Sequence, residues 1–203
     1  AFPIYYRTHQ LVNWNPLDYV TLITILTKEL TLEHALERFP DELIARVLQS
    51  KQLIAEMIEA RSNHLASLYE THFDFLEAEQ SLLFGHLLHP TPKSRQGLSE
   101  TEQRVFSPEF QGRFPLHYFV AHRSIVQENS IFSKSASAWI KEEIRQDERF
   151  DQQVKDDYLD NEQYVILPVH PAQARYLLQQ PAIQQAIDQQ LLIDTGSHGK
   201  DFY

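Results

Sequence analysis

The feature that most constrains the fold is a long stretch without glycine or proline, from residue 41 to residue 84. Within it, apolar side chains recur three and four residues apart, as on a helix with one buried stripe: Leu43, Ile44, Val47, Leu48, Ile54, Met57 and Ile58. Because this stretch is long for a single globular helix, we expect a break near residues 71 to 74. The pattern predicts at least two helices here.

A second helical pattern lies upstream, from Leu17 to about Phe39. Asn15 and Pro16 precede it, and Asp18 falls in its first turn, where the helix dipole favours an acidic side chain. Together the two patterns predict a helical lobe over residues 1–80.

After Gly85 the sequence changes to short aromatic and β-branched runs. Residues 114–122 and 163–171 read as strands, the second almost continuously apolar, as in a buried strand. Residues 191–196 read as a further strand that ends at Gly196.

Helices alternate with these strands. Residues 135–146 and 171–189 have helical patterns, and Pro171 and Pro181 suit first-turn positions. The expected fold class is therefore α+β: a helical N-terminal lobe, then a mainly antiparallel sheet with flanking helices over residues 81–203.

Composition excludes several classes of protein. Hydrophobic residues make up 42% of the 203 residues and aromatic residues 11%, enough for a real core. The formal net charge of -10 leaves no overall basic surface for nucleic acid. The absence of cysteine excludes disulfides, thiolate metal sites and a cysteine nucleophile. No apolar run approaches the roughly 18 residues of a membrane span, so we expect a cytoplasmic protein with no membrane partner.

One local cluster of basic residues stands out against this acidic background. The segment FGHLLHPTPKSRQG, residues 84–97, contains Pro90 and Pro92, which fix φ and make the segment stiff. Lys93 offers a point charge and Arg95 a planar fork, a combination that suits phosphate or carboxylate. We call this segment the 84–97 loop.

Three interpretations of this loop stay open from the residues alone. It can be a solvated connector, or a binding loop in which His86 and His89 add donors near neutral pH. The third is a metal site formed by His86 and His89 with His170, which the neighbouring prolines and the lack of an adjacent acid disfavour. The glycine-rich phosphate loop of P-loop nucleotidases is absent from the sequence.

The order of the short motifs resembles one enzyme family. EAEQSLLFGHLLHPTPKSRQG is followed by SPEF, FPLHYFVA and ILPVHPAQ, the last ahead of an amphipathic helix. This order is similar to that of the siderophore synthetases that work without a nonribosomal peptide synthetase, the aerobactin-synthetase-like enzymes. The resemblance is strongest from Glu77 to Gln173 and weaker from Phe2 to about Asp74. It includes Glu109 of SPEF, which we interpret as structural or as a partner of a loop cation.

The resemblance implies an ATP-dependent ligase of siderophore biosynthesis. Such enzymes activate a carboxylate, typically of citrate, as an acyl-adenylate, which an amine or hydroxyl of a hydroxamate-bearing or similar substrate then attacks. A carboxylate and a triphosphate repel each other, so such a site needs cationic groups and Mg²⁺ to neutralise their charge.

The family's motif residues can be matched one by one to this sequence. His86 and His89 would face the nucleotide or the adenylate, and Lys93 and Arg95 would lie near phosphate or fix the loop. Leu87 and Ala172 depart from the family pattern, which usually has proline and tryptophan there. The expected catalytic residues are His86, His89, Lys93 and Arg95, the expected nucleotide-binding residues are Gly85, Ser94, Gly97, His170 and Gln173, and no residue is expected to be a metal ligand.

The resemblance also implies that this chain is a central or N-terminal fragment. In the family, a serine- and threonine-rich segment ending in a nucleotide-binding arginine would follow Tyr203. We therefore expect the 203 residues alone to be inactive, and the intact enzyme to be a homodimer. Two alternatives from other classes are a non-catalytic anion- or carboxylate-binding module and an interaction scaffold with an exposed polar loop.

Overall fold

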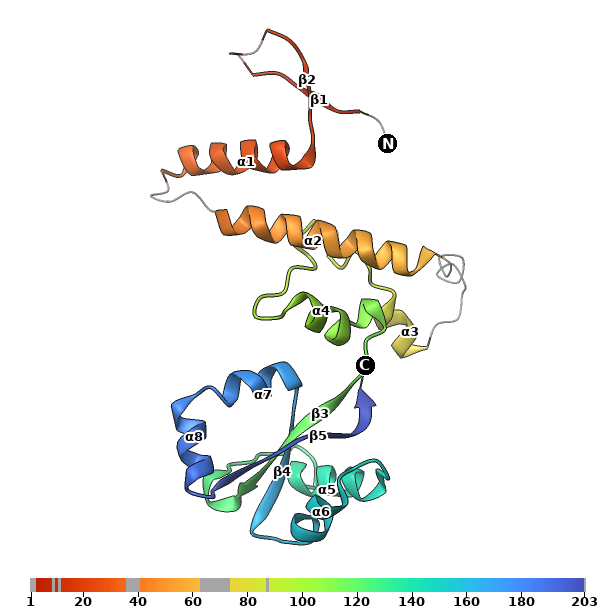
Figure 1. Ribbon diagram of the computed structural model, residues 1–203, viewed down its shortest axis with the longest axis vertical. Helices are drawn as coiled ribbons and strands as arrows, with labels where there is room; N and C mark the ends of the chain where they lie inside the picture. The colour runs from red at the N-terminus through yellow and green to blue at the C-terminus, as the bar shows by residue number, and fades with distance from the viewer. Residues whose placement is uncertain are drawn as a thin grey trace. The chain divides into compact units, whose positions relative to one another are not determined.

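The computed structural model describes residues 3–8, 10, 12–35, 41–62, 74–86 and 88–202 (Figure 1). The chain divides into two compact units, Ala1–Gly97 and Leu98–Tyr203. In this division the 84–97 loop belongs to the first unit, where it bonds to a helix, and the lobe boundary expected after residue 80 stays a prediction. Among the described residues, no helix has both the length and the apolar character that a bilayer crossing requires.

The first unit begins with a short hairpin, β1 (Tyr5–Tyr6) paired antiparallel with β2 (Asn15–Pro16). Helix α1 (Tyr19–Glu33) follows, and its N-cap is Asp18, whose side chain accepts from the backbone N–H groups of the first turn. These hydrogen bonds, chiefly those from Thr21, hold the pKa of Asp18 below its usual range. The helix therefore begins two residues later than the pattern from Leu17 predicted, and residues 36–40 lie outside the described chain.

Two helices lie in the described residues of the glycine- and proline-free stretch, as predicted. Helix α2 (Asp41–Ala60) buries Met57 of the predicted apolar stripe and also Leu53. Helix α3 (Phe75–Gln80) begins after Asp74, which forms a reciprocal capping box with Glu77. The predicted break falls mostly on residues 63–73, which lie outside the described part of the chain.

The second unit is built on a three-stranded antiparallel sheet in the order β4-β3-β5. Strand β3 (Phe114–His122) is central and pairs on one side with β4 (Tyr164–Val169) and on the other with β5 (Leu192–Phe202). All three predicted strands are present, and their antiparallel arrangement is confirmed.

The prediction that Gly196 ends the last strand is wrong. Strand β5 continues to Phe202 and remains paired with β3, with register shifts between Pro115 and His117 and between Tyr118 and Phe119. Gly196 has φ +81°, a conformation that glycine adopts without steric cost. Instead of ending the strand, it lies in a β-bulge.

Helices and short turns surround this sheet. The predicted helices at 135–146 and 171–189 are confirmed, the latter as two helices with Pro171 and Pro181 in their first turns. The α-helices are α4 (Glu100–Phe106), α5 (Ala136–Gln146), α6 (Gln152–Val154), α7 (Pro171–Leu177) and α8 (Pro181–Asp188), with 3₁₀ turns at Pro108–Phe110 and Arg123–Ile125 and a π-helix at Lys155–Leu159.

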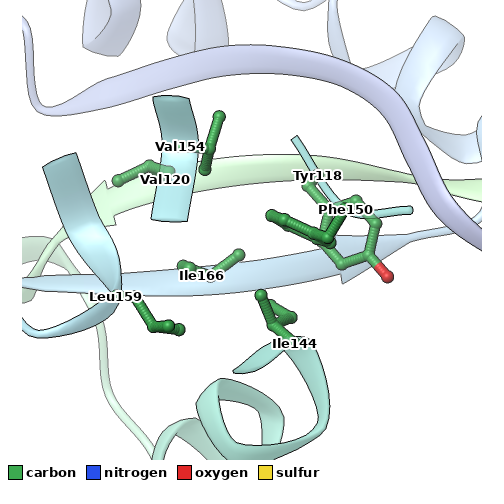
Figure 2. Packing of buried hydrophobic residues seen from close by; sticks show 7 residues of the cluster. All are labelled: Tyr118, Val120, Ile144, Phe150, Val154, Leu159 and Ile166. Atoms are coloured by element: carbon green, nitrogen blue, oxygen red, sulfur yellow. The ribbon is translucent and has the colours of Figure 1, made fainter. Parts of the chain in front are cut away.

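The central strand contributes to a core on each face of the sheet, because successive residues of a strand point to opposite faces. On the face covered by α5 and α6, Figure 2 shows Tyr118, Val120, Ile144, Phe150, Val154, Leu159 and Ile166 packed together. The other face, covered by α7 and α8, buries Phe119, Ala121, Val165, Ala174 and Leu192.

Truncation of a core side chain tests this packing. Ile166 is fully buried, so we expect Ile166→Ala to lower the free energy of unfolding by about 2–5 kcal/mol, through lost burial and a residual cavity. Ile131 is 95% exposed, so Ile131→Ala should change it by less than about 0.5 kcal/mol. Urea unfolding of the two variants measures both, and equal effects would contradict the described core.

Candidate functional site

The 84–97 loop is held against helix α2 by hydrogen bonds from its own backbone and side chains. The backbone N–H of Lys93 donates to Ser50 Oγ at 3.0 Å, and Ser94 Oγ donates to Gln49 Oε1 at 2.9 Å. Because Ser50 is almost fully buried, these bonds fix the C-terminal half of the loop to the helix.

The side chain of Lys93 lies inside the first unit. Lys93 is 4% exposed, and its Nζ donates to the carbonyl of Leu82. A Cβ atom at Gly85 would lie 3.4 Å from this Nζ, and Gly85 itself has φ +61°. The ammonium therefore joins the start of the loop to its middle. This placement favours the second role expected for Lys93, which is to fix the loop.

The two loop histidines are exposed, and both use Nδ1 as an acceptor. The N–H of Leu88 donates to His86 Nδ1 at 3.3 Å, and the N–H of Thr91 donates to His89 Nδ1 at 3.1 Å. In the neutral ring the proton must then be on Nε2. The ring centroids are 6.4 Å apart, so two Nε2–H donors lie close together at the surface of the loop.

Two further loop residues shape this surface. Arg95 is half-buried, and Gly97 has φ +77° with open space where a Cβ would be. The left-handed conformation of Gly97 allows the chain to turn at the end of the loop.

The second motif, in the second unit, uses its histidine in the same way. His170 is the N-cap of α7, and the N–H of Ala172 donates to its Nδ1 at 3.2 Å. The rings of Phe106 and Phe114 contact it edge-on, with centroids 4.6 and 4.8 Å away. Burial lowers the pKa of His170 and favours the neutral ring. Gln173 is exposed in the first helical turn.

The expected site residues therefore fall into two groups. Residues of the 84–97 loop belong to the first unit and His170 to the second. Glu109, whose role was expected to be structural or ion-pairing, is 5% exposed. Within the described ranges, no group of three or more histidine and acidic side chains is placed to hold a metal ion.

A polar cluster lies on the sheet that no sequence motif had indicated. His117 Nε2 lies 2.7 Å from Asp194 Oδ1, and His117 Nδ1 lies 3.3 Å from Ser197 Oγ. The residues are 77 and 80 positions apart along the chain, so no local motif connects them. We call these three residues the His117 cluster.

The fold is that of an α+β protein. Its candidate site, the 84–97 loop, carries histidine N–H donors and an arginine that suit an anion, and the sequence has no P-loop motif. The chain belongs to the IucA / IucC family, which matches residues 74–203. This match confirms the resemblance expected from the motifs.

Curated relatives cover most of this chain. A spermidine-citrate ligase of Bacillus anthracis is 46% identical over 183 residues, which are 90% of this chain and 30% of that protein. The rhizobactin siderophore biosynthesis protein RhbC of Rhizobium meliloti (strain 1021) is 34% identical over 188 residues, 92% of this chain and 32% of that protein. The chain thus spans about a third of the length of these relatives.

The fold also matches a solved structure. The ATP-bound aerobactin synthetase IucA from a hypervirulent pathotype of Klebsiella pneumoniae superposes with a TM-score of 0.82 at 27% identity, covering 99% of this chain and 35% of that one. The expected α+β fold of a siderophore synthetase is thereby confirmed.

The lowered pKa of His170 predicts a pH-dependent stability. Its ordinary pKa is 6.5 and the folded value is lower, so the unfolded chain binds more protons as pH falls. Well above pH 6.5 the ring is neutral in both states, so His170 adds no pH dependence to the free energy of unfolding. That free energy falls as pH falls from the pKa of His170 in the unfolded chain through its lower pKa in the folded chain. His170→Asn keeps an N-cap acceptor and removes this titration. Urea unfolding at pH 7.5 and 5.5 should show a smaller loss in the variant, and an equal loss would contradict the assignment.

Proposed function

We propose that this chain is part of an ATP-dependent acid–amine ligase of siderophore biosynthesis. The reaction joins a citrate-type carboxylate, through an acyl-adenylate, to an amine or hydroxyl of a hydroxamate-bearing or similar substrate. The observation that carries this proposal is the 46% identity to a spermidine-citrate ligase across 90% of the chain. Since the chain spans about 30% of that relative, the activity is proposed for the intact enzyme.

The loop supplies groups suited to this chemistry. The Nε2–H donors of His86 and His89 are fixed in direction by the bonds to their Nδ1 atoms, and Arg95 lies on the same loop. Preorganised donors stabilise developing negative charge because they need not reorient during the reaction. In this proposal His86, His89 and Arg95 contact the reacting anions, and Lys93 holds the loop that carries them.

ATP and Mg²⁺ place different demands on the chain. The donors of the loop fit a polyphosphate, with Gly85, Ser94 and Gly97 shaping the backbone, and we propose that His170 and Gln173 complete the nucleotide site. Mg²⁺ commonly binds through substrate phosphates, its own waters and one or two carboxylates. It can therefore enter with ATP, without a metal cage among the described residues. Bound ATP supplies the group that activates the carboxylate.

The setting of the enzyme follows from the same proposal. Its partners are citrate or a related carboxylate and an amine- or hydroxyl-bearing precursor, with no nucleic acid and no membrane. We place it in the cytoplasm, where ATP is the common energy source, and propose a homodimer as the resemblance implies.

Substitutions in the loop test the proposal in the intact enzyme. Arg95→Ala and His86→Ala each remove a hydrogen bond to a charged group, which contributes about 1.5–3 kcal/mol. If the bond forms mainly in the transition state, citrate-dependent ATP–pyrophosphate exchange falls roughly tenfold to a hundredfold. Lys93→Ala should also lose most of the activity, by loosening the loop. Circular dichroism should show an intact fold for the Arg95 and His86 variants.

Lys28→Ala is the matched control, because Lys28 is an exposed cation of α1 in the same unit. It should exchange at the wild-type rate. Wild-type exchange by the Arg95 and His86 variants would instead favour a solvated loop. Binding of Mg-ATP and citrate by calorimetry without any exchange would favour the non-catalytic anion-binding module.

The 203 residues alone should not form an adenylate. The α-phosphate, the carboxylate and Mg²⁺ must be held together, and misplacement by about 1 Å can cost on the order of a hundredfold. In the family, further nucleotide ligands are expected beyond Tyr203. The measurement is citrate-dependent pyrophosphate exchange by this chain beside a protein of the relatives' length. Similar rates would show that the active site lies within these residues.

A further inference from the structure

The His117 cluster is a hydrogen-bonded chain of carboxylate, imidazole and hydroxyl on one face of the sheet. His117 Nε2 lies 2.7 Å from Asp194 Oδ1, and Ser197 Oγ lies 3.3 Å from His117 Nδ1. The His117 side chain is 12% exposed and that of Asp194 36%, while Ser197 is exposed. The buried imidazole therefore lies between a partly exposed carboxylate and an exposed hydroxyl.

A β-bulge brings the cluster together. Asp194 and Ser197 are three residues apart, so in a regular strand they would point to opposite faces. Asp194 pairs with Phe119, and Ser197 pairs with His117 after a register shift. Phe119 and His117 share a face of β3, so the bulge puts both β5 side chains on that face. The positive φ of Gly196 forms the bulge. Bulges that re-aim a side chain are frequent beside active sites.

Local hydrogen bonds hold the bulge in this shape. The N–H of Gly196 donates to Asp194 Oδ1 at 3.0 Å, the same oxygen that faces His117. Thr195 Oγ1 donates to the carbonyl of Tyr118 at 2.7 Å, across to the central strand. The carboxylate is thus fixed before any substrate arrives.

The hydrogen bonds of His117 differ from those of the motif histidines. In His86, His89 and His170, the acceptor Nδ1 is occupied by a backbone N–H. In His117, the Nε2–H donates a hydrogen bond to the Asp194 carboxylate. The lone pair of Nδ1 therefore faces the Ser197 hydroxyl. An imidazole that is oriented by a carboxylate and hydrogen-bonded to a hydroxyl can accept the proton of that hydroxyl. The motif histidines are placed to donate, and His117 is placed to accept.

We propose that the His117 cluster is a proton acceptor for the nucleophile of the ligase reaction, with a primary ammonium as the substrate class. This role rests on the proposed function. The ammonium gives a proton to Ser197 Oγ as the Ser197 hydroxyl proton moves to His117 Nδ1. Asp194 stabilises the resulting imidazolium. The amine lone pair then forms the C–N bond with the activated carboxyl carbon, and the C–O bond to the leaving phosphate breaks. The second proton of the amine nitrogen leaves with that phosphate, and His117 returns its own proton to water.

The position of the cluster within the second unit supports this role. His117 pairs with Val169, the residue before the motif residue His170, so the two histidines lie at neighbouring places on β3 and at the end of β4. Asp194 and His198, both on β5, are titratable groups near His117, and the ring of Phe119 packs 4.8 Å away.

The experiment compares two nucleophiles in the intact enzyme. Spermidine is an ammonium at neutral pH and must lose a proton, whereas hydroxylamine is already unprotonated. His117→Gln and Ser197→Ala should slow amide formation with spermidine by on the order of a hundredfold or more. Hydroxamate formation and citrate-dependent pyrophosphate exchange should stay within about twofold of wild type. The defect with spermidine should shrink as pH rises, because solvent then removes the proton.

His122→Gln is the matched control. His122 lies on the same strand, and its Nδ1 also faces a serine hydroxyl, that of Ser124 at 2.7 Å. No carboxylate of the described residues is bonded to its ring, so this variant should react with both nucleophiles at wild-type rates. An equal loss with hydroxylamine in the His117 and Ser197 variants would overturn the proposal, as would a covalent acyl group on Ser197 in mass spectra.

A second measurement needs no activity. Ring ¹⁵N NMR of this chain should show neutral His117 with its proton on Nε2, and Asp194→Asn should shift that resonance while leaving His122 unchanged. A proton on Nδ1 in the wild type would overturn the acceptor role. If the intact enzyme shows no citrate-dependent exchange, the proposed function fails, and the NMR result alone decides whether the cluster is set up to accept a proton.

Discussion

The pairing of β3 with a strand on each side is the interaction on which the second unit depends. Both edges of β3 are hydrogen-bonded, to β4 and to β5, and its residues from Tyr118 to Ala121 are all buried. Alternate residues supply the two cores, so each face needs helices to exclude water, α5 and α6 on one and α7 and α8 on the other. The same register sets the position of the His170 motif at the end of β4 and brings the β5 residues of the His117 cluster beside His117 on β3.

In the first unit, a buried ammonium has a comparable organising role. The Lys93 ammonium donates to the carbonyl of Leu82, just ahead of the loop, while its backbone N–H donates to Ser50 of α2. Burying a charge costs free energy unless polar partners compensate, so such a residue strongly specifies the conformation around it. The side chains of the 84–97 loop therefore point in two directions, into the first unit or toward solvent. The Lys93 side chain faces inward, and His86 and His89 face outward with defined donors.

These observations suggest a division of work among the histidines. Where a backbone N–H occupies Nδ1, as in His86 and His170, the ring presents a donor suited to anions. Where a carboxylate occupies Nε2, as in His117, the ring presents an acceptor. A ligase needs both, because activation of the acid concentrates negative charge and attack by the amine releases a proton. One residue type can serve opposite functions, because the groups around each ring decide which nitrogen carries the proton.

The sequence by itself determined what depends on short-range chemistry. The periods of three to four and of two residues gave helices and strands, proline marked the starts of α7 and α8, and the motif order gave the family. Tertiary structure decided the rest. The bond from Lys93 to Ser50 spans 43 residues and that from His117 to Asp194 spans 77. Only the folded chain shows that Lys93 lies inside and that Gly196 bulges a strand instead of ending it, because both follow from packing and pairing between distant segments.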